Sequence, residues 1–186
     1  MNTPNKLTLA RVIITPVFLF FLLCSLPHHW LIAWLVFLLA SITDMIDGKL
    51  ARKLDQVTTF GQLADPLADK MLITAALLAF LHLGLCGVWP VFLILMREFA
   101  VTSMRLIAAA QGAVIPANIF GKIKTAVQML FTGVILLWGE LVERFGFLKL
   151  EFAGVSGGMI WIMAALALIS GVITILKAKK VIDFTM

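Results

Sequence analysis

The sequence predicts an all-α integral membrane protein, a single domain over residues 1–186 built from six transmembrane helices. Of the 186 residues, 62% are hydrophobic and only 13% are charged, and the mean hydropathy is +1.07. A soluble domain of this length cannot hide so much apolar surface, because every globule leaves much of its surface to water. The apolar residues also fall into six long segments separated by turn residues, as in a multi-pass membrane protein.

Six segments meet the length of a membrane-spanning helix, which needs about 20 mostly apolar residues. We expect spans at about 7–27, 30–53, 61–85, 88–110, 121–143 and 154–177. Turn residues mark four of the breaks: Pro27 after the first segment, Gly84 to Pro90 before the fourth, Gly112 and Pro116 before the fifth, and Gly154 to Gly158 opening the sixth. The first segment follows basic residues as a signal peptide does, but no small-x-small cleavage site follows it, so we expect it to be retained.

Basic residues mark one side of these six spans. They lie at both termini and around the second and fourth connections: Lys6, Arg11, Lys49, Arg52, Lys53, Lys70, Arg97, Arg105, Lys122, Lys124, Lys177, Lys179 and Lys180. The other side holds Arg144 and Lys149, offset by three glutamates. An excess of lysine and arginine marks the cytoplasmic side, so both termini are predicted to be cytoplasmic. The net charge of +5 then reflects contact with anionic membrane lipid, and no nucleic-acid partner is expected.

One region of the second and third segments concentrates ionisable residues, which are costly within a membrane and therefore indicate function. This acidic signature consists of eight residues at fixed spacing: Asp44, Asp47, Gly48, Ala51, Arg52, Gly61, Asp65 and Asp69. At 3.6 residues per turn, the first five fall on one stripe of the second helix and the last three on one stripe of the third. A short loop makes these helices antiparallel neighbours, so the two stripes can face each other near the cytoplasmic surface.

The four aspartates of the signature indicate a metal site. Four carboxylates at close quarters repel one another and raise each other's pKa values, and divalent cations remove that penalty. Carboxylate oxygens are the ligands that Mg²⁺ and Mn²⁺ prefer. Two metal ions held by such a cluster suit displacement at phosphorus, where the attacking and the leaving oxygen both need stabilisation.

The remaining signature residues favour a bulky phosphate-containing ligand over two simpler interpretations. Gly48, Ala51 and Gly61 leave room on the same stripes, and Arg52 can bind a phosphate with its forked donors. Close helix packing alone would use the small residues but not four acids. An ion or proton carrier would distribute its acids through the depth of the membrane and would not need the small residues or the arginine. A purely structural subunit leaves the four acids unexplained.

At these eight positions the sequence resembles the CDP-alcohol phosphotransferase family, whose signature D-x2-D-G-x2-A-R-x8-G-x3-D-x3-D it matches throughout. The resemblance implies a metal site of Asp44, Asp47, Asp65 and Asp69, with Asp69 as the general base for an acceptor hydroxyl. It implies a homodimer. It further implies a set of residues that bind the CDP-lipid: Asn5, Thr8, Gly48, Arg52 and Thr58. Asn5 and Thr8 could otherwise serve only as helix caps.

Four further stretches resemble the bacterial branch of this family that makes phosphatidylglycerophosphate: Pro4 to Arg11, Asp65 to Lys70, Arg97-Glu98 and Gly121 to Thr125. The implied reaction joins CDP-diacylglycerol and sn-glycerol 3-phosphate, giving phosphatidylglycerophosphate and CMP at the cytoplasmic face of the bacterial inner membrane. The comparison points to Arg105, Lys122 and Lys124 as the site for the acceptor phosphate.

The same basic residues could instead serve the membrane surface or the fold. Basic side chains near helix ends commonly extend to anionic headgroups, and Arg97 can pair with Glu98 or another nearby acid. The acceptor could also be inositol phosphate, serine or phosphatidylglycerol. A basic group of this kind favours a phosphorylated acceptor and argues against serine.

Overall fold

The computed structural model contains six α-helices and no strand in the parts of the chain that it describes, residues 3–54, 59–113, 118–146 and 149–179. Within these ranges, the side chains of residues 3–8, 44–54, 59–67 and 69 lie outside the description. The helices are α1 (Thr3–Leu23), α2 (His29–Leu54), α3 (Thr59–His82), α4 (Val88–Ala110), α5 (Ile119–Phe145) and α6 (Lys149–Ala178). The prediction of an all-α chain with six helices is confirmed.

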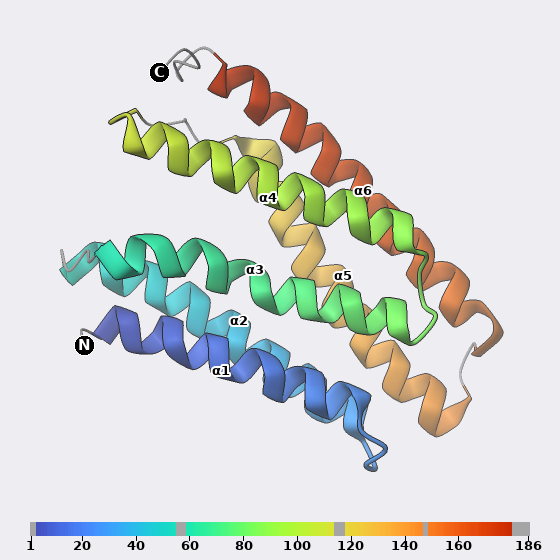
Figure 1. Ribbon diagram of the computed structural model, residues 1–186. Helices are drawn as coiled ribbons and strands as arrows, with labels where there is room; N and C mark the ends of the chain where they lie inside the picture. The colour runs from blue at the N-terminus through green and yellow to red at the C-terminus, as the bar shows by residue number, and fades with distance from the viewer. Residues whose placement is uncertain (1–2, 55–58, 114–117, 147–148, 180–186) are drawn as a thin grey trace.

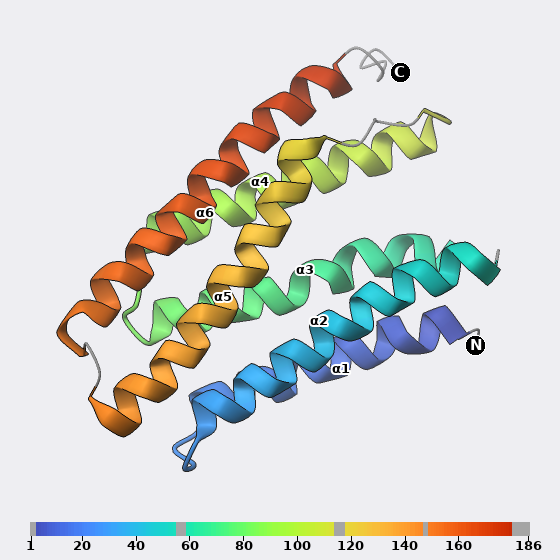
Figure 2. The same ribbon diagram turned by 180° about the vertical axis from the view of Figure 1, so that it is seen from behind.

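The helices run alternately up and down (Figure 1). The start of α1, the end of α2, the start of α3 and the ends of α4 and α6 lie toward one end of the bundle, and the view from behind agrees (Figure 2). Helix α1 packs on α2 and α3, whereas α6 packs on α4 and α5, and α5 also contacts α2. The chain therefore brings the ends of helices from both halves of the sequence to one end of the molecule.

Several helix boundaries differ from the predicted spans, most clearly in α1, α5 and α6. Helix α1 begins at Thr3 and ends at Leu23, four residues earlier at each end than the predicted segment. Helix α6 begins at Lys149, so the prediction that Gly154 to Gly158 open the last helix was wrong. These glycines lie inside a helix of high apolar content, where packing outweighs the low intrinsic helix propensity of glycine. Helix α5 continues to Phe145 and ends at Gly146, whose φ of 64° is the left-handed conformation that glycine adopts at helix ends.

The exterior of the bundle is rich in large apolar side chains. Each helix exposes at least one of them by 47% or more, as shown by Phe20, Leu39, Leu78, Phe99, Leu130 and Leu176. An exterior with so many exposed apolar side chains is typical of a protein that contacts lipid. Helices α5 and α6 are long and apolar enough to cross a membrane, and shorter apolar stretches lie in α1, α2 and α3. The composition and this exterior together indicate a membrane protein.

Close packing of α2 against α5 depends on Gly139. A Cβ atom added at this position would lie only 2.4 Å from Cε3 of Trp30, because the indole ring lies directly against the α5 backbone. The Trp30 ring also packs edge-on against Phe152 of α6, with ring centroids 6.1 Å apart. Gly139 therefore allows a buried tryptophan to join three helices.

Replacement of Gly139 by alanine should destabilise the protein. The new methyl group would push Trp30 out of its site, and overpacking of this kind costs about 1–3 kcal/mol. The matched control is Gly158→Ala, because a Cβ atom at Gly158 meets nothing within 4 Å. Thermal unfolding of the purified variants in detergent checks this, with a lower Tm expected for Gly139→Ala alone. An unchanged Tm for Gly139→Ala would show that Trp30 can move at little cost.

Candidate functional site

The two halves of the acidic signature lie on two helices that meet at one end of the bundle. The segment 44–52 occupies the last turns of α2, and the segment 61–69 occupies the first turns of α3. Helix α1 packs against both of these helices, and its first turns lie at the same end (Figure 1). The predicted assignment of the signature to two neighbouring helices is confirmed for the backbone.

Most of the residues assigned to metal and CDP-lipid have side chains that lie outside the description: Asn5, Thr8, Asp44, Asp47, Gly48, Arg52, Asp65 and Asp69. Thr58 lies outside the described residues altogether. Among the side chains that are described, no group of three or more His, Cys, Asp or Glu residues could hold a metal ion. The donor set at the helix ends, four carboxylates, suits Mg²⁺ or Mn²⁺ by its chemistry. The roles of these residues stay predictions.

The three basic residues assigned to the acceptor phosphate have different surroundings. Arg105, near the end of α4, and Lys122, in the first turn of α5, are exposed. Lys124 is only 5% exposed and turns into the bundle. Residues two positions apart on a helix differ in direction by about 200°, so Lys122 and Lys124 must point to nearly opposite sides. The structure brings Lys124 to Glu98 instead of to an exposed site, and its assignment as a phosphate ligand stays a prediction.

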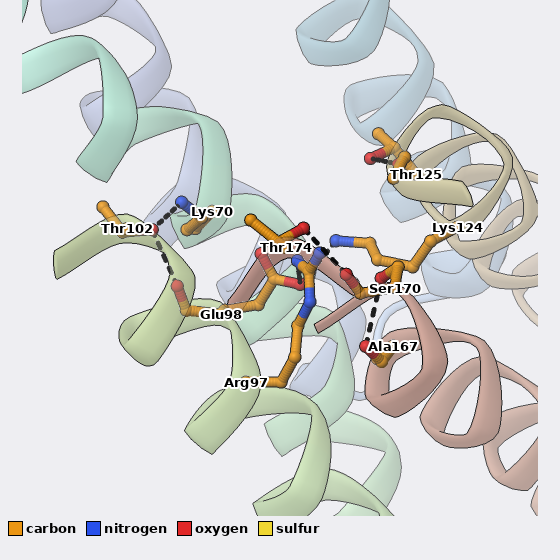
Figure 3. Close-up of polar contacts among 10 residues, drawn as sticks. Lys70, Arg97, Glu98, Thr102, Lys124, Thr125, Ala167, Ser170 and Thr174 are labelled. Carbon is orange, nitrogen blue, oxygen red and sulfur yellow. Dashed lines mark hydrogen bonds and ion pairs between the residues drawn. The ribbon is translucent and has the colours of Figure 1, made fainter. Parts of the chain in front are cut away.

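Glu98 is the centre of a buried ionic cluster (Figure 3). Its Oε1 atom accepts a hydrogen bond from the Lys124 ammonium group of α5 and another from Arg97 Nη1 at 2.9 Å. Arg97 and Glu98 are each 8% exposed. The expected pairing of Arg97 with Glu98 is confirmed. A carboxylate buried with two cations joins α4 to α5.

A second link joins α3 to the same turn of α4. The Lys70 ammonium group donates to Thr102 Oγ1, and the Thr102 hydroxyl donates to the main-chain oxygen of Glu98 at 2.7 Å. Lys70 directly follows Asp69, the last residue of the signature. Thr102 lies three residues, or about one helical turn, before Arg105. The end of the signature is therefore tied to α4 one turn from a predicted phosphate-binding residue.

Helix α6 closes the other side of this cluster. A Cβ atom at Gly171 would lie 2.7 Å from Cγ of Arg97, so the arginine stem lies directly on the α6 backbone. Ser170 and Thr174 beside it are buried and bond to main-chain oxygens of their own helix. We define the buried cation cluster as Lys70, Arg97, Glu98, Thr102 and Lys124. Four helices contribute to its surroundings.

Sequence reasoning did not identify this cluster as a unit. Lys70 entered only the assignment of orientation and one stretch of the family resemblance, and nothing singled out Thr102. One signal was present: Glu98 is an acid within an apolar helix, where an unpaired charge would be costly. Its partners on other helices could not be read from the sequence, because they depend on how the helices rotate against each other.

Contacts between histidine and glutamate side chains also join two helices at the opposite end. His28 Nδ1 lies 2.5 Å from Glu140 Oε1, and His29 Nε2 lies 2.8 Å from Glu143 Oε2. The main-chain nitrogen of Leu31 donates to Glu140 Oε2 at 3.3 Å. These contacts join the start of α2 to the last turns of α5, far along both helices from the signature. They account for two of the glutamates that offset the basic residues on this side.

Comparisons with known proteins agree with the family resemblance. A family model described as CDP-alcohol phosphatidyltransferase matches residues 1–176. A protein from Bacillus subtilis (strain 168) named CDP-diacylglycerol–glycerol-3-phosphate 3-phosphatidyltransferase is 39% identical over 182 residues, covering 91% of each chain. A protein of the same name from Rickettsia felis is 36% identical over 96% of each chain. A probable phosphatidylglycerophosphate synthase from Mycobacterium tuberculosis is 45% identical over 139 residues, covering 73% of this chain and 66% of its own.

Proposed function

The chain belongs to the CDP-alcohol phosphatidyltransferase family, and we propose that it transfers the phosphatidyl group of CDP-diacylglycerol to sn-glycerol 3-phosphate. The products are phosphatidylglycerophosphate and CMP. The names of relatives that are similar along almost their whole length support this reaction. So do the eight signature residues, all present at the family spacing.

One contact supports the proposal beyond family membership. The bond of Lys70 to Thr102 joins the end of the signature on α3 to α4, one turn before Arg105. Arg105 is exposed there, as is Lys122 at the start of α5. A dianionic acceptor phosphate needs fixed positive charge close to the reacting hydroxyl. An acceptor held by Arg105 and Lys122 would lie beside the signature, as the reaction requires.

The reaction is a single in-line displacement at phosphorus. The acceptor hydroxyl oxygen bonds to the phosphatidyl phosphorus, the bond from that phosphorus to CMP breaks, and Asp69 takes the hydroxyl proton. Arg52 holds a phosphate of the CDP group, and Asn5, Thr8, Gly48 and Thr58 complete the nucleotide-lipid site. The segment 44–69 contains no serine, histidine or cysteine that could form a covalent phosphatidyl-enzyme.

Members of this family generally use divalent metal ions, and we propose that Asp44, Asp47, Asp65 and Asp69 hold two ions of Mg²⁺ or Mn²⁺. Such ions supply positive charge that polarises the pyrophosphate and stabilises the departing CMP. The chain's own contribution is to keep four carboxylates on two adjoining helix ends, where they would otherwise repel one another.

The proposed setting is a bacterial inner membrane that all six helices cross, with the signature at the cytoplasmic side. Helix α2 has 26 residues and is therefore about 39 Å long, which exceeds the roughly 30 Å of a hydrocarbon core. Asp44 is the first Asp, Glu, Lys or Arg residue of this helix, so the signature that begins there can lie at the membrane surface. Water-soluble glycerol 3-phosphate could reach it there. We also propose, from the family resemblance, that the protein works as a homodimer.

The test of the reaction is release of CMP from CDP-diacylglycerol by purified protein in detergent, with one acceptor supplied at a time. CMP should appear with sn-glycerol 3-phosphate and not with serine, inositol phosphate or phosphatidylglycerol. Asp69→Asn is the matched inactive variant, since loss of a placed base lowers turnover by about 10²–10⁴-fold. Turnover with another acceptor alone would reassign the substrate, and normal turnover by Asp69→Asn would require a different base.

Removal of divalent metal should abolish turnover. Excess EDTA should stop CMP release completely, and Mg²⁺ or Mn²⁺ added back should restore it. The physical reason is that four uncompensated carboxylates would repel the pyrophosphate of the substrate as well as one another. NaCl added to the same ionic strength controls for general charge screening. Full activity in EDTA would contradict the two-metal site.

Loss of Arg105 or Lys122 should weaken use of the acceptor selectively. A hydrogen bond to a charged group contributes roughly 1.5–3 kcal/mol, so Arg105→Ala should lower kcat/KM for glycerol 3-phosphate by about 10- to 100-fold. The KM for CDP-diacylglycerol should change little. Arg105→Lys should restore only part of the activity, because one ammonium group cannot reproduce the guanidinium fork.

Arg144→Ala provides the control, since Arg144 is an exposed arginine at the opposite end of the bundle. Saturation curves for each substrate check all of these variants. Equal losses for both substrates in Arg105→Ala would assign the residue to the fold and not to the acceptor.

A further inference from the structure

We infer that Glu98 is a positioning residue for the acceptor side of the reaction: its carboxylate fixes α5, which carries Lys122, against α4, which carries Arg105 and is itself joined to the signature helix α3 through Thr102 and Lys70. This inference rests on the proposed function and deepens it. It is carried by three contacts that form one continuous path between helices. Lys70 of α3 binds Thr102 of α4, Thr102 binds the main chain of Glu98, and the Glu98 carboxylate binds Lys124 of α5.

The residues of α4 that make these contacts lie on the same face of the helix as Arg105, a predicted ligand of the acceptor phosphate. Glu98, Thr102 and Arg105 lie four and three residues apart, so they follow one face of the helix. Arg105 is about 10 Å further along the axis than Glu98, at 1.5 Å per residue. On α5, Lys124 lies about half a turn beyond Lys122 and points inward where Lys122 points outward. Glu98 therefore bonds to Lys124, which points inward from the same turn of α5 that carries the predicted phosphate-binding residue Lys122.

The energetics indicate a function beyond stability. Burial of ions removes their hydration, and a buried ion pair is commonly no better for stability than apolar residues of the same volume. Among the described side chains, two buried cations, Arg97 and Lys124, share the Glu98 carboxylate. Arg97 Nε has no partner among the described residues. Such an arrangement contributes little to net stability, but it holds α4 and α5 in one register, and orientation of reactants is worth large rate factors.

The obvious variant, Glu98→Gln, is expected to lower stability as well as function, because it leaves two buried cations without their carboxylate. A double variant, Glu98→Gln with Arg97→Met, removes one of those cations too, leaves the predicted phosphate ligands in place and should recover much of the lost Tm. The KM for glycerol 3-phosphate should stay raised, because no ionic contact joins α5 to α4 in this variant. We expect KM for glycerol 3-phosphate to be about tenfold above the parent in both variants, with KM for CDP-diacylglycerol within about twofold.

Glu143→Gln is the matched control, since Glu143 also pairs across helices but at the opposite end. It should leave both KM values unchanged. Glu98→Asp keeps the charge on a shorter stem and should recover part of the acceptor KM.

The experiment uses the full chain in detergent, with saturation curves for both substrates and a thermal unfolding curve for each variant. Return of the acceptor KM together with Tm in the double variant would show that Glu98 acts only on stability, and would overturn the inference. An unchanged acceptor KM in Glu98→Gln would overturn it as well. If the parent protein released no CMP with glycerol 3-phosphate, the proposed function itself would fail, which is a different result.

Discussion

The position of α4 relative to α5 depends on the bond between the Glu98 carboxylate and the Lys124 ammonium group. It links α4 to α5 inside an otherwise apolar bundle, and Arg97 and Thr102 attach the same turn of α4 to α6 and α3. Apolar side chains alone allow helices to slide and rotate, because many registers bury similar areas. A buried charge has few acceptable partners, so it selects one register. The polar cluster therefore supplies the specificity that the apolar packing lacks.

The polar contacts between helices differ in burial at the two ends of the bundle. At the end away from the signature, His28 and His29 pair with two glutamates of α5, and the exposed members of these pairs need little desolvation. Exposed pairs of this kind contribute little to stability. Toward the signature end, the partners are buried and two cations share the Glu98 carboxylate. The buried cluster, whose ions lose their hydration, lies near the predicted reaction site, and the more exposed pairs lie far from it. This is expected if the relative position of the helices matters more at the site.

The helices were predictable from the sequence because apolar length and turn residues decide them locally. The acidic signature was also predictable, since its eight residues and their spacing lie in one continuous stretch. What the sequence could not supply was the rotation of each helix about its axis. Lys122 and Lys124 looked equivalent as basic residues, yet the helix turns one outward and the other toward Glu98. The contact of Lys70 with Thr102 joins residues 32 positions apart, and no local pattern indicates it.

Glycine residues allow large side chains of one helix to lie against the backbone of another. Gly171 lets the stem of Arg97 lie on the α6 backbone, and Gly139 does the same for Trp30 on α5. In both cases the glycine faces a large side chain of another helix, so the close approach serves a specific partner and not the flexibility of the chain. The glycines of 154–158 looked like a helix start in the sequence, yet they lie inside α6. Gly154 and Gly158 have no neighbour within reach of a Cβ atom, so whether a glycine ends a helix depends on how the rest of the helix packs and not on the glycine alone. That dependence limits sequence reasoning most strongly where helices meet around buried charge, which is also where the acceptor side of the proposed reaction is assembled.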